Sequence, residues 1–113
     1  VETLNVNEDN PWYGTPGGED TMDYIFPLSI GEVVRYFGDS GQLENGSPNG
    51  GWHIDDEYND ARMDAGGNMW WLRSPGSSSG YATVVNNRGQ VSVYGSSVSS
   101  FEIRLRPAMW ITM

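Results

Sequence analysis

Carboxylates gather in one short stretch of the chain, and they are the side chains with the plainest capacity for chemistry. The stretch contains Asp55, Asp56, Glu57, Asp60 and Asp64. Calcium takes about six to eight oxygens from carboxylates and carbonyls, so this group is a candidate calcium site. The alternation of Asp or Asn with a central Gly and a closing Glu that marks an EF-hand loop is absent from the sequence. We therefore interpret the stretch as a solvated acidic loop and predict no cofactor, with calcium as the alternative.

Nucleophilic and metal-assisted catalysis have little support in the sequence. His53 is the only histidine and the chain has no cysteine, so the usual transition-metal ligand sets cannot be assembled. Ser74 and Asp55 are present, but no elbow motif surrounds any serine. We predict that the protein is not an enzyme. Glycoside hydrolysis by a carboxylate pair stays open as an alternative, because two acids can come together from anywhere in a fold.

A contact surface is indicated between Ser77 and Phe101, where serines, asparagines, tyrosines and glycines alternate with single apolar residues. Tyrosine offers a large amphipathic contact while freezing few torsions, and small polar residues adapt their hydrogen bonds. The predicted ligand-binding residues are Ser78, Ser79, Tyr81, Thr83, Asn86, Arg88, Ser92, Tyr94, Ser96, Ser97, Ser99 and Phe101. Tyr81, Tyr94 and Phe101 would be the anchors. The alternative is a set of solvent-facing strand and turn positions with no ligand.

The elements that must position these residues can be read from local patterns. Residues 1–20 read as a loop arm, which Trp12 and Tyr13 pin to the body. Ser29 and Glu32 form a capping box ahead of an apolar face of helical period, which predicts a helix over 30–37 with Gly38 as a left-handed stop. A long irregular stretch follows from 38 to 67, with a short helix over 56–63 as one option.

The last third of the chain is rich in β-branched and aromatic residues between turn clusters. Strands are predicted over 69–73, 81–86, 90–94 and 102–111. Asn86 to Gly89 is a hairpin turn and Gly95 marks the next bend, so an antiparallel meander fits best. An earlier strand near Tyr24 to Leu28 contains Pro27, which favours an edge position or a short strand.

Tryptophan and arginine residues in the apolar motifs are interpreted as framework. Trp70 and Trp71 are neighbours in a strand and point to opposite faces, so at most one could lie on a given surface. Arg73 and Arg106 each lie near a proline in an apolar motif, where a buried charge needs a partner such as Asp23 or Glu32. Recognition of an acidic ligand by these arginines is the alternative. The loop residues Trp12 and Trp52 are better placed to touch a ligand.

Composition limits the class of protein and of partner. The chain of 113 residues is long enough for one domain over 1–113. Its net charge of −9, with arginine as its only strongly basic residue type, repels nucleic acid and anionic membrane surfaces. No apolar run is long enough to cross a bilayer, and we expect no membrane insertion. Because the chain starts at Val1 rather than Met, we expect it to be part of a larger protein.

Three motifs together carry a family resemblance. They are residues 21–29 leading into Glu32, the run Trp-Trp-Leu-Arg-Ser-Pro-Gly at 70–76, and the ending Leu-Arg-Pro-Ala-Met-Trp at 105–110. The sequence resembles a family of bacterial surface and phage-associated domains with a WWLRSPG and RPALW signature. This resemblance implies a C-type-lectin-like α+β fold, in the branch of formylglycine-generating enzymes, with a small antiparallel sheet, one or two short helices and long irregular loops. Those enzymes depend on cysteine, which is absent here.

The same branch includes the variable proteins of diversity-generating retroelements, so residues 77–104 are a candidate variable and binding region. From the resemblance and the composition we expect a ligand-binding or adhesion module for protein or glycan targets. We expect it to be extracellular, at a cell surface or on a phage particle. A structural domain of a surface appendage or phage tail is the alternative. Pro27, Leu105 and the segment 102–104 depart from the family pattern and bear on the register of the last hairpin.

Overall fold

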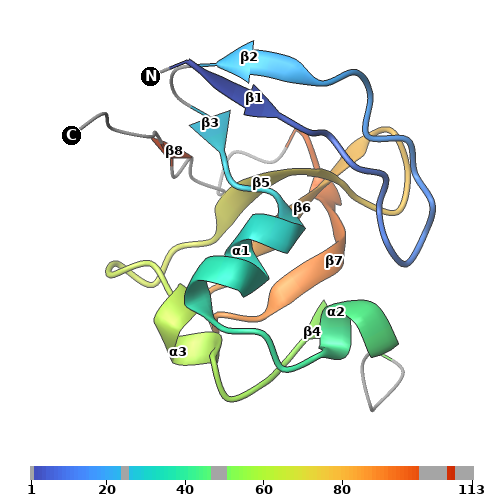
Figure 1. Cartoon of the computed structure of the whole chain (residues 1–113). Helices are drawn as coiled ribbons and strands as arrows, with labels where there is room; N and C mark the ends of the chain where they lie inside the picture. The colour runs from blue at the N-terminus through green and yellow to red at the C-terminus, as the bar shows by residue number, and fades with distance from the viewer. Residues whose placement is uncertain (1, 24–25, 47–50, 100–106, 109–113) are drawn as a thin grey trace.

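The computed structural model describes residues 2–23, 26–46, 51–99 and 107–108. These residues form an α+β domain with antiparallel strand pairing, as expected from the sequence, but with three short helices rather than one or two and three sheets rather than one (Figure 1). The strands are β1 Thr3–Asn5, β2 Thr21–Asp23, β3 Phe26–Pro27, β4 His53–Ile54, β5 Trp70–Pro75, β6 Tyr81–Val85, β7 Val91–Ser97 and β8 Pro107–Ala108. The helices are α1 Ile30–Phe37, α2 Gln42–Asn45 and α3 Asn59–Arg62. None of these helices is long and apolar enough to cross a membrane.

The main sheet has the strand order β4-β7-β6-β5, and all its pairings are antiparallel. Its last three strands form the predicted meander, and Gly89 at φ 81 closes the turn between β6 and β7. The prediction was wrong about the fourth strand of the main sheet. β4 lies beside β7, whereas β8, the described part of the predicted strand 102–111, pairs with β3 in a separate sheet. Pro27 therefore lies in a two-residue strand, which tolerates its missing N–H.

Helix α1 lies over one face of the main sheet (Figure 1). Its capping box is formed, because the Ser29 hydroxyl accepts a hydrogen bond from the Glu32 N–H while the Glu32 carboxylate accepts one from the Ser29 N–H. The buried side of α1 packs on apolar residues of all four strands of the main sheet. The core that they form together consists of Ile30, Val33, Val34, Ile54, Trp70, Leu72, Val85, Val91 and Val93.

Gly38 ends α1 in a different way from the prediction. Its backbone has φ 134 and ψ 136, outside the left-handed helical region. The cause is a close approach, because a Cβ at this position would lie 2.2 Å from the Tyr58 ring. The helix therefore ends where the chain passes over a side chain from the irregular stretch.

The N-terminal arm is more ordered than the predicted loop. β1 and β2 pair as an antiparallel ribbon, with Leu4 opposite Met22. Trp12 packs against the core and its indole N–H donates to the Leu43 carbonyl at 3.1 Å. The prediction that Trp12 and Tyr13 hold the arm to the body is thus confirmed for the indole, and the Tyr13 ring contacts Tyr94.

A fully buried arginine holds the irregular stretch to the sheet. Arg62 forms an ion pair with Asp56 at 2.5 Å, and its Nε donates to the Gly89 carbonyl at 2.9 Å. The Arg62 carbonyl in turn accepts the indole N–H of Trp70. A buried charge is tolerated only when it is paired and hydrogen-bonded, so these bonds fix α3 against the β6–β7 turn. No local pattern in the sequence marks Arg62 as buried.

The same contacts set the ionisation of Asp56. Burial alone would raise its pKa, but hydrogen bonds from Arg62, Ser40 and the Tyr58 N–H, with the charge of Arg62, lower the pKa below its usual value. A carboxyl with a lowered folded pKa contributes stability that is present above the unfolded pKa of about 3.9. That contribution is lost as the pH falls through the folded pKa.

We predict that Asp56→Asn lowers the free energy of unfolding by about 3–5 kcal/mol, because it leaves Arg62 buried without its anionic partner. The matched control is Asp60→Asn on α3, an exposed carboxylate whose loss should change stability by less than about 0.5 kcal/mol. Urea denaturation of both variants at neutral pH measures the difference. Equal stability of the two variants would contradict the role given to the ion pair.

Candidate functional site

Four aromatic rings from four separate segments meet at the surface beside the main sheet. Tyr94 of β7 is their centre, with ring centroids 5.7 Å from Tyr13, 4.9 Å from Trp52 and 5.7 Å from Tyr81. The two tyrosine contacts are edge-on, whereas the Trp52 ring is tilted by only 31° from that of Tyr94. Trp52 is nevertheless 58% exposed, so much of the indole is open to solvent. We call these four residues the aromatic cluster.

Asn10 holds Tyr13 in the aromatic cluster. Its buried amide nitrogen donates to the carbonyls of Pro75 and Val93, at 2.8 and 2.9 Å, and so joins the arm to β5 and β7. Its amide oxygen accepts the backbone N–H groups of Trp12 and Tyr13, both at 2.9 Å. One side chain thus satisfies four backbone groups at once, which fixes the turn that carries Tyr13.

Burial, followed in effect by the nearby Tyr94, raises the pKa of Tyr13. A tyrosine phenol is neutral at physiological pH even with its ordinary pKa of about 10, and the raised pKa of Tyr13 disfavours the charged form further, so its hydroxyl is a hydrogen-bond donor. The aromatic cluster contains no carboxylate, arginine or histidine, so it is an uncharged patch on a strongly acidic protein.

Glycine allows β7 and the β5–β6 loop to meet under the cluster. A Cβ on Gly76 would lie 2.6 Å from the Tyr94 carbonyl oxygen and 2.8 Å from the Tyr81 Cβ. Gly95 has φ 86 and its N–H donates to the buried Ser92 hydroxyl at 3.1 Å. Both pairings of β6, with β5 and with β7, shift register at Thr83, as in a β-bulge. The predicted bend at Gly95 is thus an irregularity within β7.

Serines border the aromatic cluster on the loop and on the end of β7. The Tyr81 N–H donates to the Ser78 carbonyl at 3.1 Å, and Tyr81 lies opposite Ser97 in the pairing of β6 with β7. The Val98 N–H donates to the Gly80 carbonyl at 3.1 Å, which holds the β5–β6 loop beside the end of β7. Seven of the predicted residues lie at this end of the sheet: Ser78, Ser79, Tyr81, Tyr94, Ser96, Ser97 and Ser99. Tyr13 and Trp52 join them from outside the predicted region.

The other predicted site residues lie elsewhere. Thr83 and Ser92 are buried and bond to the Ser74 carbonyl and the Gly95 N–H, so the expectation that they face outward is wrong. That expectation rests on their residue type and their place in the segment 77–101, and neither shows that both pairings of β6 shift register beside Thr83. Asn86 and the exposed Arg88 belong to the turn at the opposite end of β6 and β7. Phe101 lies outside the described residues.

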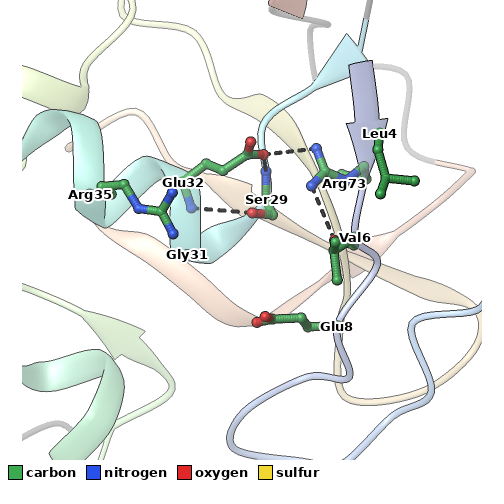
Figure 2. A pocket seen from close by; sticks show the side chains of 8 residues that line it. All are labelled: Leu4, Val6, Glu8, Ser29, Gly31, Glu32, Arg35 and Arg73. Carbon is green, nitrogen blue, oxygen red and sulfur yellow. Dashed lines mark hydrogen bonds and ion pairs between the residues drawn. The ribbon is translucent and has the colours of Figure 1, made fainter. Parts of the chain in front are cut away.

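The tryptophan and arginine residues of the apolar motifs were predicted to be framework residues. Trp70 is buried in the core while Trp71, half-buried, does not belong to that core, as expected for neighbours in a strand. Arg73 pairs with Glu32 at 2.8 Å, which confirms one of its two predicted partners (Figure 2). Arg106 lies outside the described residues.

The acidic stretch makes internal contacts. Asp56 pairs with Arg62, and Asp55 accepts the Asn59 amide at 2.6 Å. Asp64 accepts the side-chain amide of Asn68 at 3.0 Å. In the part of the chain that the structure describes, no three His, Asp or Glu residues are grouped to hold a metal ion.

A family model described as "Domain of unknown function (DUF6273)" matches residues 1–113, so the chain belongs to that family. No curated protein and no solved structure matches the chain.

We predict that Gly76→Ala lowers the free energy of unfolding by about 1–3 kcal/mol, because the new methyl group overlaps Tyr94 and Tyr81. Gly80→Ala is the matched control in the same loop, since its Cβ would meet nothing within 4 Å. That control should be neutral or stabilising by up to about 1 kcal/mol. Thermal denaturation followed by near-UV circular dichroism reports both stability and ring packing. Two equally stable variants with unchanged aromatic signals would argue against the close contact.

Proposed function

We propose that this protein is a ligand-binding or adhesion module whose contact surface is the aromatic cluster with its serine border. The observation that carries the proposal is the convergence of four rings from four segments around Tyr94 with Trp52 largely exposed. Trp52 gains one ring contact there but leaves apolar area in water, which is unfavourable in the free protein. A bound target that covers the indole would recover that free energy.

The residue types suit this role. Tryptophan and tyrosine are enriched among the few residues that dominate binding energy in protein interfaces. Asn10 fixes the turn that carries Tyr13, and the Tyr94 ring contacts the other three rings, so part of the side-chain entropy is already lost before binding. The bordering serines supply adaptable hydrogen bonds, and a protein or a glycan is the proposed target.

The wider setting is proposed on the sequence motifs. We propose a C-type-lectin-like fold and a place at a cell surface or on a phage particle. Under the retroelement hypothesis the variable positions are the serine border, Tyr81 and Tyr94, because Thr83 and Ser92 are buried and Asn86 and Arg88 lie at the opposite end of the sheet. Variation among close relatives at the bordering serines, with Asn10 and Gly76 unchanged, is what that hypothesis expects.

The two alternatives have less support. A carboxylate-pair hydrolase needs a general acid with a raised pKa, whereas the pKa of Asp56 is lowered by its pairing with Arg62. A structural appendage domain would need the same framework, but it gives no reason for an exposed indole in the aromatic cluster.

We predict that Trp52→Ala reduces affinity for a target found on a glycan array or a panel of purified surface proteins by at least about tenfold, the usual loss at a binding hot spot. Ser78→Arg is a second variant that obstructs the same surface without removing a packed ring, and it should also weaken binding. Surface plasmon resonance measures both.

The matched controls are Asn87→Ala and Arg88→Ala, exposed residues at the opposite end of β6 and β7. They should bind as the unchanged protein does, and melting temperatures should show that all four variants are folded. The proposal fails if the controls lose as much affinity as the cluster variants, or if only the controls lose affinity.

A further inference from the structure

A pocket of about 270 Å³ lies between the N-terminal segment and α1 (Figure 2), and no residue of the aromatic cluster lines it. One wall carries Leu4, Val6 and Glu8, alternate residues of an extended segment whose side chains share one side. The opposite wall is α1, where Gly31 and Arg35 are four residues apart and so lie on one helical face.

Arg73 lines the pocket between these two walls. It pairs with Glu32 of α1 and donates to the Val6 carbonyl at 3.3 Å and to the Asn7 side chain at 2.8 Å. These bonds tie the two walls together and so set their separation. Glu32 and Arg73 neutralise each other, so neither offers an unpaired charge to a ligand.

Two further charges at the pocket have no partner among the described residues. Glu8 and Arg35 are both exposed, and their side chains extend beside the same opening from opposite walls (Figure 2). On the wall that carries Glu8, Leu4 and Val6 leave 57% and 50% of their surface in solvent. The pocket thus combines one anion, one cation and an aliphatic strip.

We infer that this pocket binds a small zwitterion, an α-amino acid with an aliphatic side chain. The Arg35 guanidinium donates to the ligand carboxylate, and the Glu8 carboxylate accepts from the ligand ammonium. The ligand side chain covers Leu4 and Val6, which removes their apolar surface from water. The cavity volume is just below the range of pockets for drug-sized molecules, as a ligand of this size requires.

The charge of the protein narrows the ligand class. A net charge of −9 opposes a purely anionic ligand, whereas a zwitterion brings no net charge to the site. The competing arrangement is that Glu8 and Arg35 turn toward each other and pair, which would leave no site for a zwitterion.

The test is titration of the protein with leucine, N-acetylleucine and leucinamide, followed by the NMR shifts of Leu4, Val6 and Gly31. Leucine should bind about three- to fivefold more tightly than either analogue, because each analogue loses one solvent-exposed ion pair. Absence of leucine binding at tens of millimolar, or equal affinity for the three compounds, would overturn the inference.

Two variants assign the charges. Glu8→Gln should make leucine bind no better than N-acetylleucine, and Arg35→Gln should make leucine bind no better than leucinamide. Glu57→Gln and Arg88→Gln are charge-matched controls at exposed positions outside the pocket, and both should keep the preference for leucine. If Glu8→Gln and Arg35→Gln also keep that preference, the assignment is wrong. This outcome does not depend on the aromatic cluster.

Discussion

Buried polar side chains that bond to backbone groups are the constraint on which the rest of this fold depends. Much of the described chain is irregular, and its backbone N–H and C=O groups cannot be buried without partners. Asn10 satisfies four such groups, and Arg62 bonds to Gly89 while it accepts from Trp70. Arg73 joins the N-terminal segment to α1 in the same manner. These side chains supply hydrogen bonds to backbone groups that have no partner strand.

This organisation gives the two ends of the main sheet different roles. At one end, Asn10 and Gly76 let the arm, the β5–β6 loop and β7 approach closely, and aromatic rings come together at the surface. At the other end, Arg62 anchors α3 beneath the β6–β7 turn, so that turn serves the framework. The proposed contact surface follows from this difference more than from the composition of residues 77–104 taken alone.

The sequence predicted the parts of the structure that depend on local patterns. Ser29 with Glu32 identified the start of α1, Gly89 identified the hairpin, and the buried charge of Arg73 called for Glu32. The remaining features depend on long-range contacts. Asn10 next to a proline has the pattern of a turn, and nothing local indicates that its amide reaches Val93. Thr83 and Ser92 are polar residues of the types that favour a surface, but both are buried where the strand register shifts.

The central claim is that the aromatic cluster and its serine border, rather than the whole segment 77–104, contact the target. Amide hydrogen exchange with and without a bound target tests it most directly. We expect slower exchange on binding at 77–81 and 94–98, where the chain borders Tyr94, and unchanged exchange at the turn 86–90. Protection confined to 86–90, or spread evenly over both ends of the sheet, would contradict it.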